Sequence, residues 1–523
     1  MTRKELPYAD LREFMRDLED RGKLRRWQRA IDKDRQLMPL LRLQYRGLPD
    51  DERQAHLFEQ VVDSKGKRYD MQTVSGVYGA SRSIFALGLG CEDPADIYER
   101  WHEAVNCPCP PVIVNSGACQ EVVHTGPDIQ ASGLAALPVP VEEPGFSGGL
   151  RTTTPMITRD PRSGARNVGT YSGHFVSPDT LLGGIGPGKH AKRHQGAADR
   201  QEPGLPIAIT VGTLPDIVYA GAANLPFGVD ELAVAGALRG RPVELVRCKT
   251  IPLEVPAEAE IVIEGEMSFE ETGEEEAFSD YPGYLMVEHS HRPVIKVKAI
   301  THRKNALFTA ILVGLPPSEC NTISRTCREM MLYQHLKYGA GHPEVLEVCC
   351  PEMGGGWNWW VIRIRKSHPS LPSQVLHSAA GMGPLNKTII VVDEDINPKD
   401  PDMVTWALSY AMQPQRDVQI ISGRVPGLDP SAHSLMRSRE DRSFPGGVGT
   451  SGMLIDATRK GPYPPVGLPL REYMEDALRI WEAEGLPKLS LREPWHGYTP
   501  PDRLWSDTDD RRAQRAVNGE SLI

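Results

Sequence analysis

Residues 166–174 read RNVGTYSGH and lie in the middle of the chain. Around them, from about residue 155 to residue 311, short segments of alternating apolar and polar residues are separated by glycine and proline. These segments include residues 207–211, 260–264, 294–297 and 307–311. Alternation with a period of two is typical of strands, and glycine and proline mark the turns between them. The middle of the chain is therefore predicted to be a mostly antiparallel β domain.

The segments on either side follow other patterns. An amphipathic helix is expected over residues 8–27, with Asp10 as its N-cap. Residues 137–145, which read LPVPVEEPG, are rich in turn residues and mark a domain boundary. Toward the C-terminus, helices are expected at residues 329–338 and 403–412. Strands are expected at residues 361–364, 387–392 and 418–421, so the two kinds of element alternate. This alternation predicts an α/β region with parallel strands.

Composition limits the kind of partner. The chain has 523 residues, with 59 Lys and Arg against 69 Asp and Glu and a net charge of −10. The length predicts two or three domains. The acidic balance argues against nucleic acid or an anionic membrane as a partner, so a small molecule is expected. No apolar run reaches the roughly 20 residues of a membrane span, and the opening MTRKEL has no signal-peptide character. A cytoplasmic location is expected.

Cysteines and the glycine-rich cluster suggest no further site. The nine cysteines are irregularly spaced, which does not predict a disulfide framework. The close pairs, CPC at residues 107–109 and CC at residues 349–350, lack a second pair at zinc-finger spacing. Residues 354–360, GGGWNWW, lack the strand, lysine and helix of a phosphate loop, so aromatic lining or packing is expected there.

Several motifs recur in a characteristic order along the chain. They are DLREF (10–14), ACQEVV (118–123), MITRDP (156–161), NVGTY (167–171), ELAVAGALRG (231–240), VPAEAEIVIEG (255–265) and DYPGY (280–284). In this order they resemble the UbiD-like decarboxylases, which use prenylated FMN (prFMN). The resemblance extends to DAT at residues 456–458 and covers most of the chain, which makes it more specific than any single motif.

The resemblance implies a multidomain α/β (α+β) fold with a central split β-barrel of the flavin-reductase type. The expected parts are an N-terminal α/β domain (1–125), the central prFMN- and metal-binding barrel (126–315), a C-terminal α/β domain (316–500) and a tail (501–523). It also implies a homodimer or homohexamer and a flavin prenyltransferase that supplies the cofactor.

A divalent cation, usually manganese, and a potassium ion are implied at the flavin phosphate. Carried onto this sequence, the metal ligands are Asn167, His190 and Glu231. The chemistry supports such a set, because a hard cation with oxygen ligands can neutralise a doubly charged phosphate. Residues 186–194, GPGKHAKRH, also contain His194 as an alternative ligand. The same loop could be a solvated basic turn or a surface for an anionic group of the substrate.

The resemblance implies an acid–base pair at Glu275 and Asp280, with Asp280 as the proton donor. Glu274 and Glu276 flank the first of these, so the register could shift by one residue, and a run of three glutamates is often a solvated face. A carboxyl group that donates a proton near neutral pH needs a raised pKa, which burial and a second carboxylate can supply.

The implied reaction is non-oxidative, reversible decarboxylation of an aromatic or α,β-unsaturated acid, with the flavin as electron sink. Such a carboxy-lyase would act in the degradation of aromatic compounds. Further cofactor contacts are implied at Thr152, Thr170, Tyr171, Ser172, Ala222, Ala223, Pro226 and Lys387.

Ser172 departs from the family pattern, which has arginine at this place, where it can hold the substrate carboxylate. Three explanations are open. His174 or Arg151 could supply the charge; the substrate could be anchored through a coenzyme A thioester, as in phthaloyl-CoA; or the chain could bind flavin but catalyse poorly. An alternative function is therefore a non-catalytic, auxiliary subunit of a carboxylase or decarboxylase complex.

Overall fold

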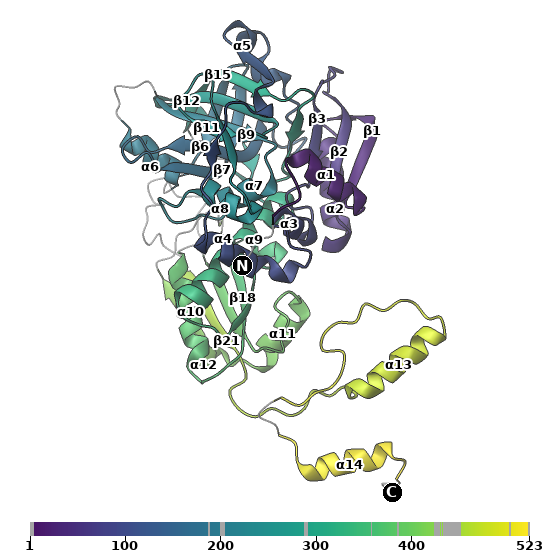
Figure 1. Cartoon of the computed structure of the whole chain (residues 1–523). Helices are drawn as coiled ribbons and strands as arrows, with labels where there is room; N and C mark the ends of the chain where they lie inside the picture. Colours follow the sequence, from purple (N-terminus) through teal and green to yellow (C-terminus); the bar gives the residue numbers. More distant parts are fainter. Residues whose placement is uncertain are drawn as a thin grey trace. The chain divides into compact units, whose positions relative to one another are not determined.

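The computed structural model describes residues 5–186, 189–198, 204–286, 291–356, 358–383, 386–422, 429, 431, 451–500 and 504–520 (Figure 1). The chain forms two compact units. The first comprises Met1–Gln334 and Glu352–Trp357, and the second His335–Pro351 and Asn358–Ile523. The expected mixed α/β, multidomain fold is confirmed. The division at residues 126 and 316 stays a prediction.

The first unit begins with helix α1 (Leu11–Asp20), which buries one apolar face. As expected, Asp10 caps it, because its Oδ1 atom accepts a hydrogen bond of 3.0 Å from the backbone N–H of Glu13. The expectation that this helix reaches residue 27 is wrong. Gly22 adopts a φ of +67°, which ends the helical turn and leads the chain into strand β1 (Leu24–Asp32).

Strand β1 belongs to a small N-terminal sheet. Its order is β1, β2 (Ala55–Val62), β3 (Gln72–Ser75) and β16 (Leu307–Thr309). The strand expected near residues 307–311 is thus present, but it pairs in parallel with β3 and not with the middle domain. Helices α2 (Leu37–Gly47), α3 (Arg82–Gly88) and α4 (Ile97–Asn106) accompany this sheet in the chain.

The centre of the first unit is a closed ring of antiparallel strands. The ring order is β12 (Ile261–Glu274), β9 (Gly204–Val211), β6 (Leu150–Arg159), β7 (Arg166–Ser177), β8 (Thr180–Gly184) and β15 (His291–His302). β15 pairs again with β12, which closes the ring. Closure removes the free sheet edges that these six strands would otherwise expose. The predicted antiparallel middle domain is confirmed, and its form is a six-stranded barrel.

Helices α7 (Pro215–Ala222) and α8 (Glu231–Arg239) pack against two barrel strands, as Figure 1 shows. Ile157 of β6 and Val168 of β7 share an apolar cluster with Ile217 of α7 and Leu232 of α8. This packing places the first residue of α8 against the first residues of β7. Further elements complete the unit: β4 (Val112–Ile113), β5 (Val122–Thr125), α5 (Pro127–Ala131), α6 (His190–Ala197), β10 (Glu244–Arg247), β11 (Glu254–Pro256), β13 (Phe278–Ser279), β14 (Leu285–Met286) and the long helix α9 (Glu319–Gln334).

The second unit has one sheet with the order β17 (Val345–Cys349), β18 (Trp359–Ile364), β19 (Thr388–Val392), β21 (Ser451–Ala457) and β20 (Val418–Ser422). Strands β18, β19 and β21 run parallel, and the two outer strands run antiparallel to them. The expected parallel component is therefore confirmed. Its helices are α10 (Leu371–Met382), α11 (Pro401–Tyr410), α12 (Pro414–Asp417), α13 (Arg471–Ala483) and α14 (Asp507–Val517).

The cysteines and the helices bear on two expectations from the sequence. All nine cysteines are free thiols. Within the described ranges, no helix combines the length and the apolar character that crossing a membrane requires.

Candidate active site

Strand β7 connects two polar clusters in the first unit. Asn167 lies at its start and Ser172 lies five residues further on, a separation of roughly 17 Å along an extended strand. The first cluster, here called the amide end, comprises Asn167, Tyr171, His190, His194 and Glu231. The second, here called the carboxylate end, comprises Glu142, Glu143, Arg151, His174, Glu275, Asp280 and Arg292.

Asn167 and Glu231 meet at the amide end although 64 positions separate them in the sequence. Glu231 is the first residue of α8, and its Oε2 atom accepts a 2.9 Å hydrogen bond from the backbone N–H of Val168. The side chains of Asn167 and Glu231 are both buried, each with 3% exposure. Burial raises the pKa of Glu231 to about 7. A cation beside this carboxylate would offset the cost of its buried charge.

Tyr171 orders the amide end. Its hydroxyl accepts a 3.4 Å hydrogen bond from Nδ2 of Asn167 and another from the backbone N–H of Ala191, at the start of α6. With Nδ2 engaged, Oδ1 is the atom of Asn167 that would ligate a cation. The phenol ring folds back over Gly169, where a Cβ atom would lie 2.2 Å from Cζ of Tyr171. The residue implied as a cofactor contact thus also positions an implied metal ligand.

Both candidate histidines lie at the amide end. His194 is buried, and its Nδ1 atom lies 3.0 Å from the hydroxyl of Thr158. Thr158 of β6 lies opposite Asn167 of β7 in the antiparallel strand pair. His190 is half-buried and meets the edge of Phe227, with ring centroids 5.2 Å apart. Within the described part of the chain, the His190 ring has no hydrogen bond. Burial lowers the pKa of both histidines, which favours the neutral form that binds metals.

The donor set fits a hard cation. In the described ranges, no three His, Cys, Asp or Glu side chains gather as a self-contained metal site. The amide oxygen of Asn167, the carboxylate of Glu231 and one imidazole would leave coordination positions for phosphate oxygens and water. The arrangement therefore suits a cation that is held jointly by the protein and a phosphate.

Gly169→Ala is expected to disturb the amide end. The new methyl group would overlap the ring of Tyr171 and push its hydroxyl away from Asn167. Overpacking of this kind costs about 1–3 kcal/mol, so thermal unfolding should shift to lower temperature and flavin retention should fall. Gly47→Ala, at the end of α2, is the matched control for overlap, because nothing lies within 4 Å of a Cβ atom there and its backbone, like that of Gly169, is not left-handed. Equal flavin content in wild type and Gly169→Ala would contradict the role given to Tyr171.

At the carboxylate end, the three glutamates of residues 274–276 differ in burial. Glu275 has 2% exposure, whereas Glu274 and Glu276 are exposed. The Nε atom of Arg292 donates a 2.7 Å hydrogen bond to Oε2 of Glu275. Burial and an arginine partner distinguish Glu275 from its neighbours, which supports the register that places it in the acid–base pair.

Asp280 lies in a tight turn after β13. The backbone N–H of Gly283 donates to the Asp280 carbonyl at 2.8 Å, and the N–H of Tyr281 donates to its Oδ1 atom at 2.7 Å. Burial raises the pKa of Asp280, and the nearby charge of Glu275 raises it further, against the opposing effect of Arg151. The two implied acid–base residues therefore lie in one electrostatic environment.

Arg151 is the buried cation beside Asp280. One of its Nη atoms donates to the Ser279 carbonyl at 3.3 Å and lies 3.7 Å from Oε2 of Glu142. Its guanidinium group lies 3.6 Å from the centroid of the Phe278 ring. Burial raises the pKa of Glu142 to about 7.

Sequence reasoning missed Glu142, Glu143 and Arg292. The two glutamates stand in a proline- and glycine-rich stretch that reads as a solvated loop, yet Glu142 is buried and burial raises the pKa of Glu143. Arg292 lies on β15 without any distinguishing motif. Burial of Glu142, partial burial of Glu143 and the bond of Arg292 to Glu275 separate these residues from ordinary surface charges, and no local pattern reports them.

Ser172 is half-buried, pairs with Gly184 across β7 and β8, and has its hydroxyl where a Cβ atom of Gly184 would lie. The positive charge near Asp280 comes instead from Arg151 and Arg292. Arg151 is one of the two residues that the sequence suggested as a replacement for the missing arginine.

The remaining implied cofactor contacts are placed as follows. Thr152 is buried, and its hydroxyl has no hydrogen-bond partner among the described residues, as expected of a group that contacts a ligand. The hydroxyl of Thr170 donates to the Val218 carbonyl at 3.4 Å. The segment from α7 to α8 contains Ala222, Ala223 and Pro226, of which Ala223 is buried and Pro226 is exposed.

Lys387 lies in the second unit, where its Nζ atom donates to Oδ2 of Asp429 at 2.7 Å. Its approach to the flavin stays a prediction. Of the GGGWNWW cluster, Trp360 is buried and donates to Asn386 at 3.2 Å, and Trp357 lies outside the described residues.

Comparison with known proteins accounts for this arrangement. Residues 112–316 match the 3-octaprenyl-4-hydroxybenzoate carboxy-lyase Rift-related domain, and residues 321–457 match the C-terminal domain of the same enzymes. The UbiD-class enzyme HmfF from Pelotomaculum thermopropionicum, solved with FMN, is 31% identical; the match covers 93% of this chain and 98% of HmfF, with a TM-score of 0.75. The chain belongs to the UbiD family. The UbiD-family fold therefore extends over both units.

Other UbiD relatives agree. An evolved dimeric form of HmfF in complex with prFMN is 31% identical, with 86% and 95% coverage and a TM-score of 0.74. The 3,4-dihydroxybenzoic acid decarboxylase AroY of Klebsiella pneumoniae is 25% identical, with 99% and 100% coverage and a TM-score of 0.75. An uncharacterised protein of Aquifex aeolicus is 31% identical over 482 residues, with 87% and 92% coverage. This UbiD protein thus has the fold of the prFMN-dependent decarboxylases.

Proposed function

We propose that this protein is a prFMN-dependent carboxy-lyase that removes carbon dioxide from an aromatic or α,β-unsaturated carboxylic acid. The observation that carries the proposal is the pair of neighbouring carboxyl groups, buried Glu275 and half-buried Asp280, with the pKa of Asp280 raised by burial. The flavin-bound HmfF structures support the cofactor.

Asn167, Glu231 and His190 would hold a divalent cation, proposed as manganese with potassium beside it, at the flavin phosphate. Bound prFMN supplies an electron sink for the electron pair that remains when carbon dioxide leaves. The buried hydroxyl of Thr152 would help to orient the cofactor.

Asp280 would deliver the proton that replaces the carboxyl group. Its raised pKa keeps the acid protonated at higher pH than a solvent-exposed aspartate. Glu275 would assist, because its negative charge disfavours ionisation of Asp280, and Arg292 holds Glu275 in place through a 2.7 Å hydrogen bond. Glu275 is buried and Asp280 is half-buried, which limits the contact of the acid with bulk water.

The proposal includes the oligomeric state, the source of the cofactor, the cellular location and the form of the substrate. A homo-oligomer is supported by the dimeric form of the HmfF relative. The proposed function also implies that a flavin prenyltransferase supplies the cofactor. It further implies a cytoplasmic location and a role in the degradation of aromatic compounds. Whether the substrate is a free acid or a coenzyme A thioester is decided by a paired assay of both forms.

The test is to produce the protein together with a flavin prenyltransferase, supply manganese and potassium, and identify the bound flavin by mass and absorbance. Release of carbon dioxide is then measured from a panel of aromatic and α,β-unsaturated acids and their thioesters. A protein that never carries the modified flavin would refute the proposal. Modified flavin without turnover of any substrate would favour the non-catalytic, auxiliary subunit.

Glu231→Gln is expected to lower bound manganese and flavin by at least about tenfold, because the substitution removes the anionic ligand while conserving shape. Metal is measured by elemental analysis and flavin by absorbance after gel filtration. Glu244→Gln, at an exposed position of β10, is the control and should retain both. Full metal content in Glu231→Gln would exclude Glu231 as a ligand.

A further inference from the structure

Arg151 has more hydrogen-bonding capacity than its protein neighbours use. An arginine side chain has five N–H donors, and among the described residues the only hydrogen bond found for Arg151 is the 3.3 Å contact to the Ser279 carbonyl. Its Nε atom is buried and has no partner in that part of the chain. The side chain is 7% exposed, so bulk water does not readily satisfy these donors.

The carboxyl groups around Arg151 do not saturate it. Oε2 of Glu142 lies 3.7 Å away, beyond the range of a good hydrogen bond. Arg292 differs, because its Nε atom contacts Glu275 at 2.7 Å. Arg151 is therefore a buried positive charge whose donors remain free for an anion, next to the proposed proton donor Asp280, on whose pKa it acts.

Other unpaired polar atoms lie near Arg151. His174 is directly opposite Arg151 in the β6–β7 ladder, and its Nδ1 atom is buried without a partner among the described residues. Oε2 of Glu142, which lies 3.7 Å from Arg151, also has no hydrogen-bond partner there. Gly149 leaves room for the imidazole, since a Cβ atom there would lie 2.7 Å from Cε1 of His174. Proteins seldom bury several unpaired polar atoms together unless a ligand supplies their partners.

We infer that Arg151 binds the carboxylate group of the substrate, with His174 as a neighbouring donor. This inference rests on the proposed function and adds the residue that orients the acid. A guanidinium group can grip a carboxylate through two parallel hydrogen bonds, which the hydroxyl of Ser172 cannot do. Arg151 thus holds the reacting carboxylate close to Asp280.

The experiment uses the full-length protein loaded with FMN, and the probes are benzoate, cinnamate and 2-furoate with their amides. Binding is measured by calorimetry for wild type, Arg151→Met and Arg151→Lys. Arg159→Met is the control, because Arg159 lies at the other end of β6 and pairs with Glu254. Wild type should bind at least one acid more tightly than its amide. Arg151→Met should weaken that acid about ten- to a hundredfold and leave amide binding and FMN content unchanged.

Arg151→Lys should lie between wild type and Arg151→Met, because it keeps the charge and loses the two-pronged geometry; it also carries the test if Arg151→Met folds poorly. Unchanged acid affinity in Arg151→Lys and Arg151→Met, or no preference of wild type for any acid over its amide, would overturn the inference. The proposed function is tested separately, by incorporation of the modified flavin and by release of carbon dioxide. Both can be absent although Arg151 binds acids, and both can be present although Arg151 does not contribute to acid binding.

Discussion

Asp280→Asn is expected to lower the rate of decarboxylation by about a hundred- to ten-thousandfold, the usual contribution of a positioned acid or base. Asparagine has nearly the same shape and can still accept the hydrogen bond from the backbone N–H of Tyr281. It cannot donate a proton to carbon. Binding of FMN and of a carboxylate should therefore survive, and the loss should appear in kcat.

The pH dependence separates Asp280 from a structural residue. The acid is active while protonated, and burial raises its pKa. Activity should therefore be full at pH values below that pKa and should fall as pH rises through it. In Asp280→Asn this alkaline limb should disappear from the residual activity. Glu271→Gln, an exposed carboxyl group of β12, is the control and should keep both the rate and the pH profile. A normal kcat in Asp280→Asn would remove Asp280 as the acid.

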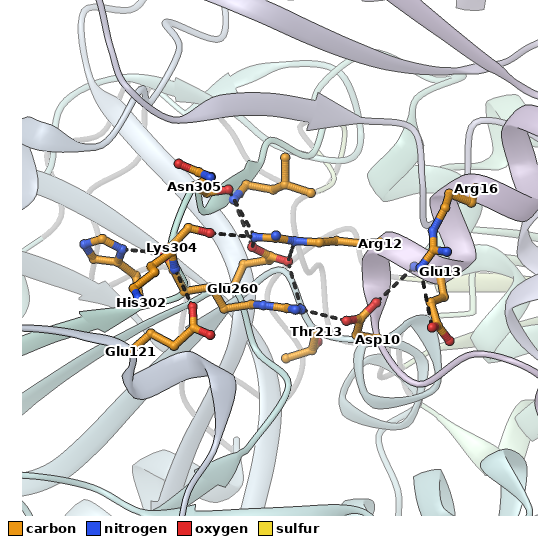
Figure 2. A network of polar contacts seen from close by, with 12 residues as sticks. Asp10, Arg12, Glu13, Arg16, Glu121, Thr213, Glu260, His302, Lys304 and Asn305 are labelled. Carbon is orange, nitrogen blue, oxygen red and sulfur yellow. Dashed lines mark hydrogen bonds and ion pairs between the residues drawn. The ribbon is translucent and has the colours of Figure 1, made fainter.

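Glu260→Gln is expected to lower the free energy of unfolding of the first unit by about 3 kcal/mol, within the range for breaking a buried ion pair. Figure 2 shows the network around this carboxylate. Arg12 of α1 binds it through two contacts of 2.7 Å, and the backbone N–H of Leu307 donates at 3.0 Å. Arg303 adds a contact of 3.4 Å.

The effect is large because the Glu260 side chain has no exposure, while Arg12 and Arg303 would lose their shared partner. The network ties the N-terminal helix to the start of β12, to the end of β15 and to β16. Thermal unfolding of the full chain, followed by tryptophan fluorescence, measures the change. Glu266→Gln is the matched control, because Glu266 pairs with Lys298 at a partly exposed position of the barrel. Equal melting temperatures for Glu260→Gln and Glu266→Gln would contradict the prediction.

Local patterns predicted elements well where side chains alternate or caps are present. The alternating segment at residues 207–211 is β9, and Asp10 caps α1 as expected. The same patterns were less reliable at element ends and in pairing. Apolar residues continue past Asp20 and predict a longer helix, whereas the left-handed backbone of Gly22 ends it. Residues 307–309 form a strand, but the choice of β3 as its partner depends on contacts across the whole unit.

For the candidate site, the sequence placed Asn167, Glu231 and Asp280 through motifs in family order. Their burial and neighbours came from the fold. Glu274, Glu275 and Glu276 are chemically identical in the sequence, and only the path of the chain buries the middle one against Arg292. The position of Lys387 relative to the flavin stays a prediction.

The sequence by itself determined the membership in the family, the antiparallel and parallel regions, and the absence of arginine at position 172, because side-chain identity and spacing are local properties. The tertiary structure alone decided that Glu142 is buried, that Tyr171 joins Asn167 to α6, and that Arg151 lies beside Asp280 with unused donors. The physical reason is that burial and charge pairing arise between strands and loops far apart in the chain. The residue that we propose in place of the missing arginine therefore lies on β6 and not within RNVGTYSGH itself.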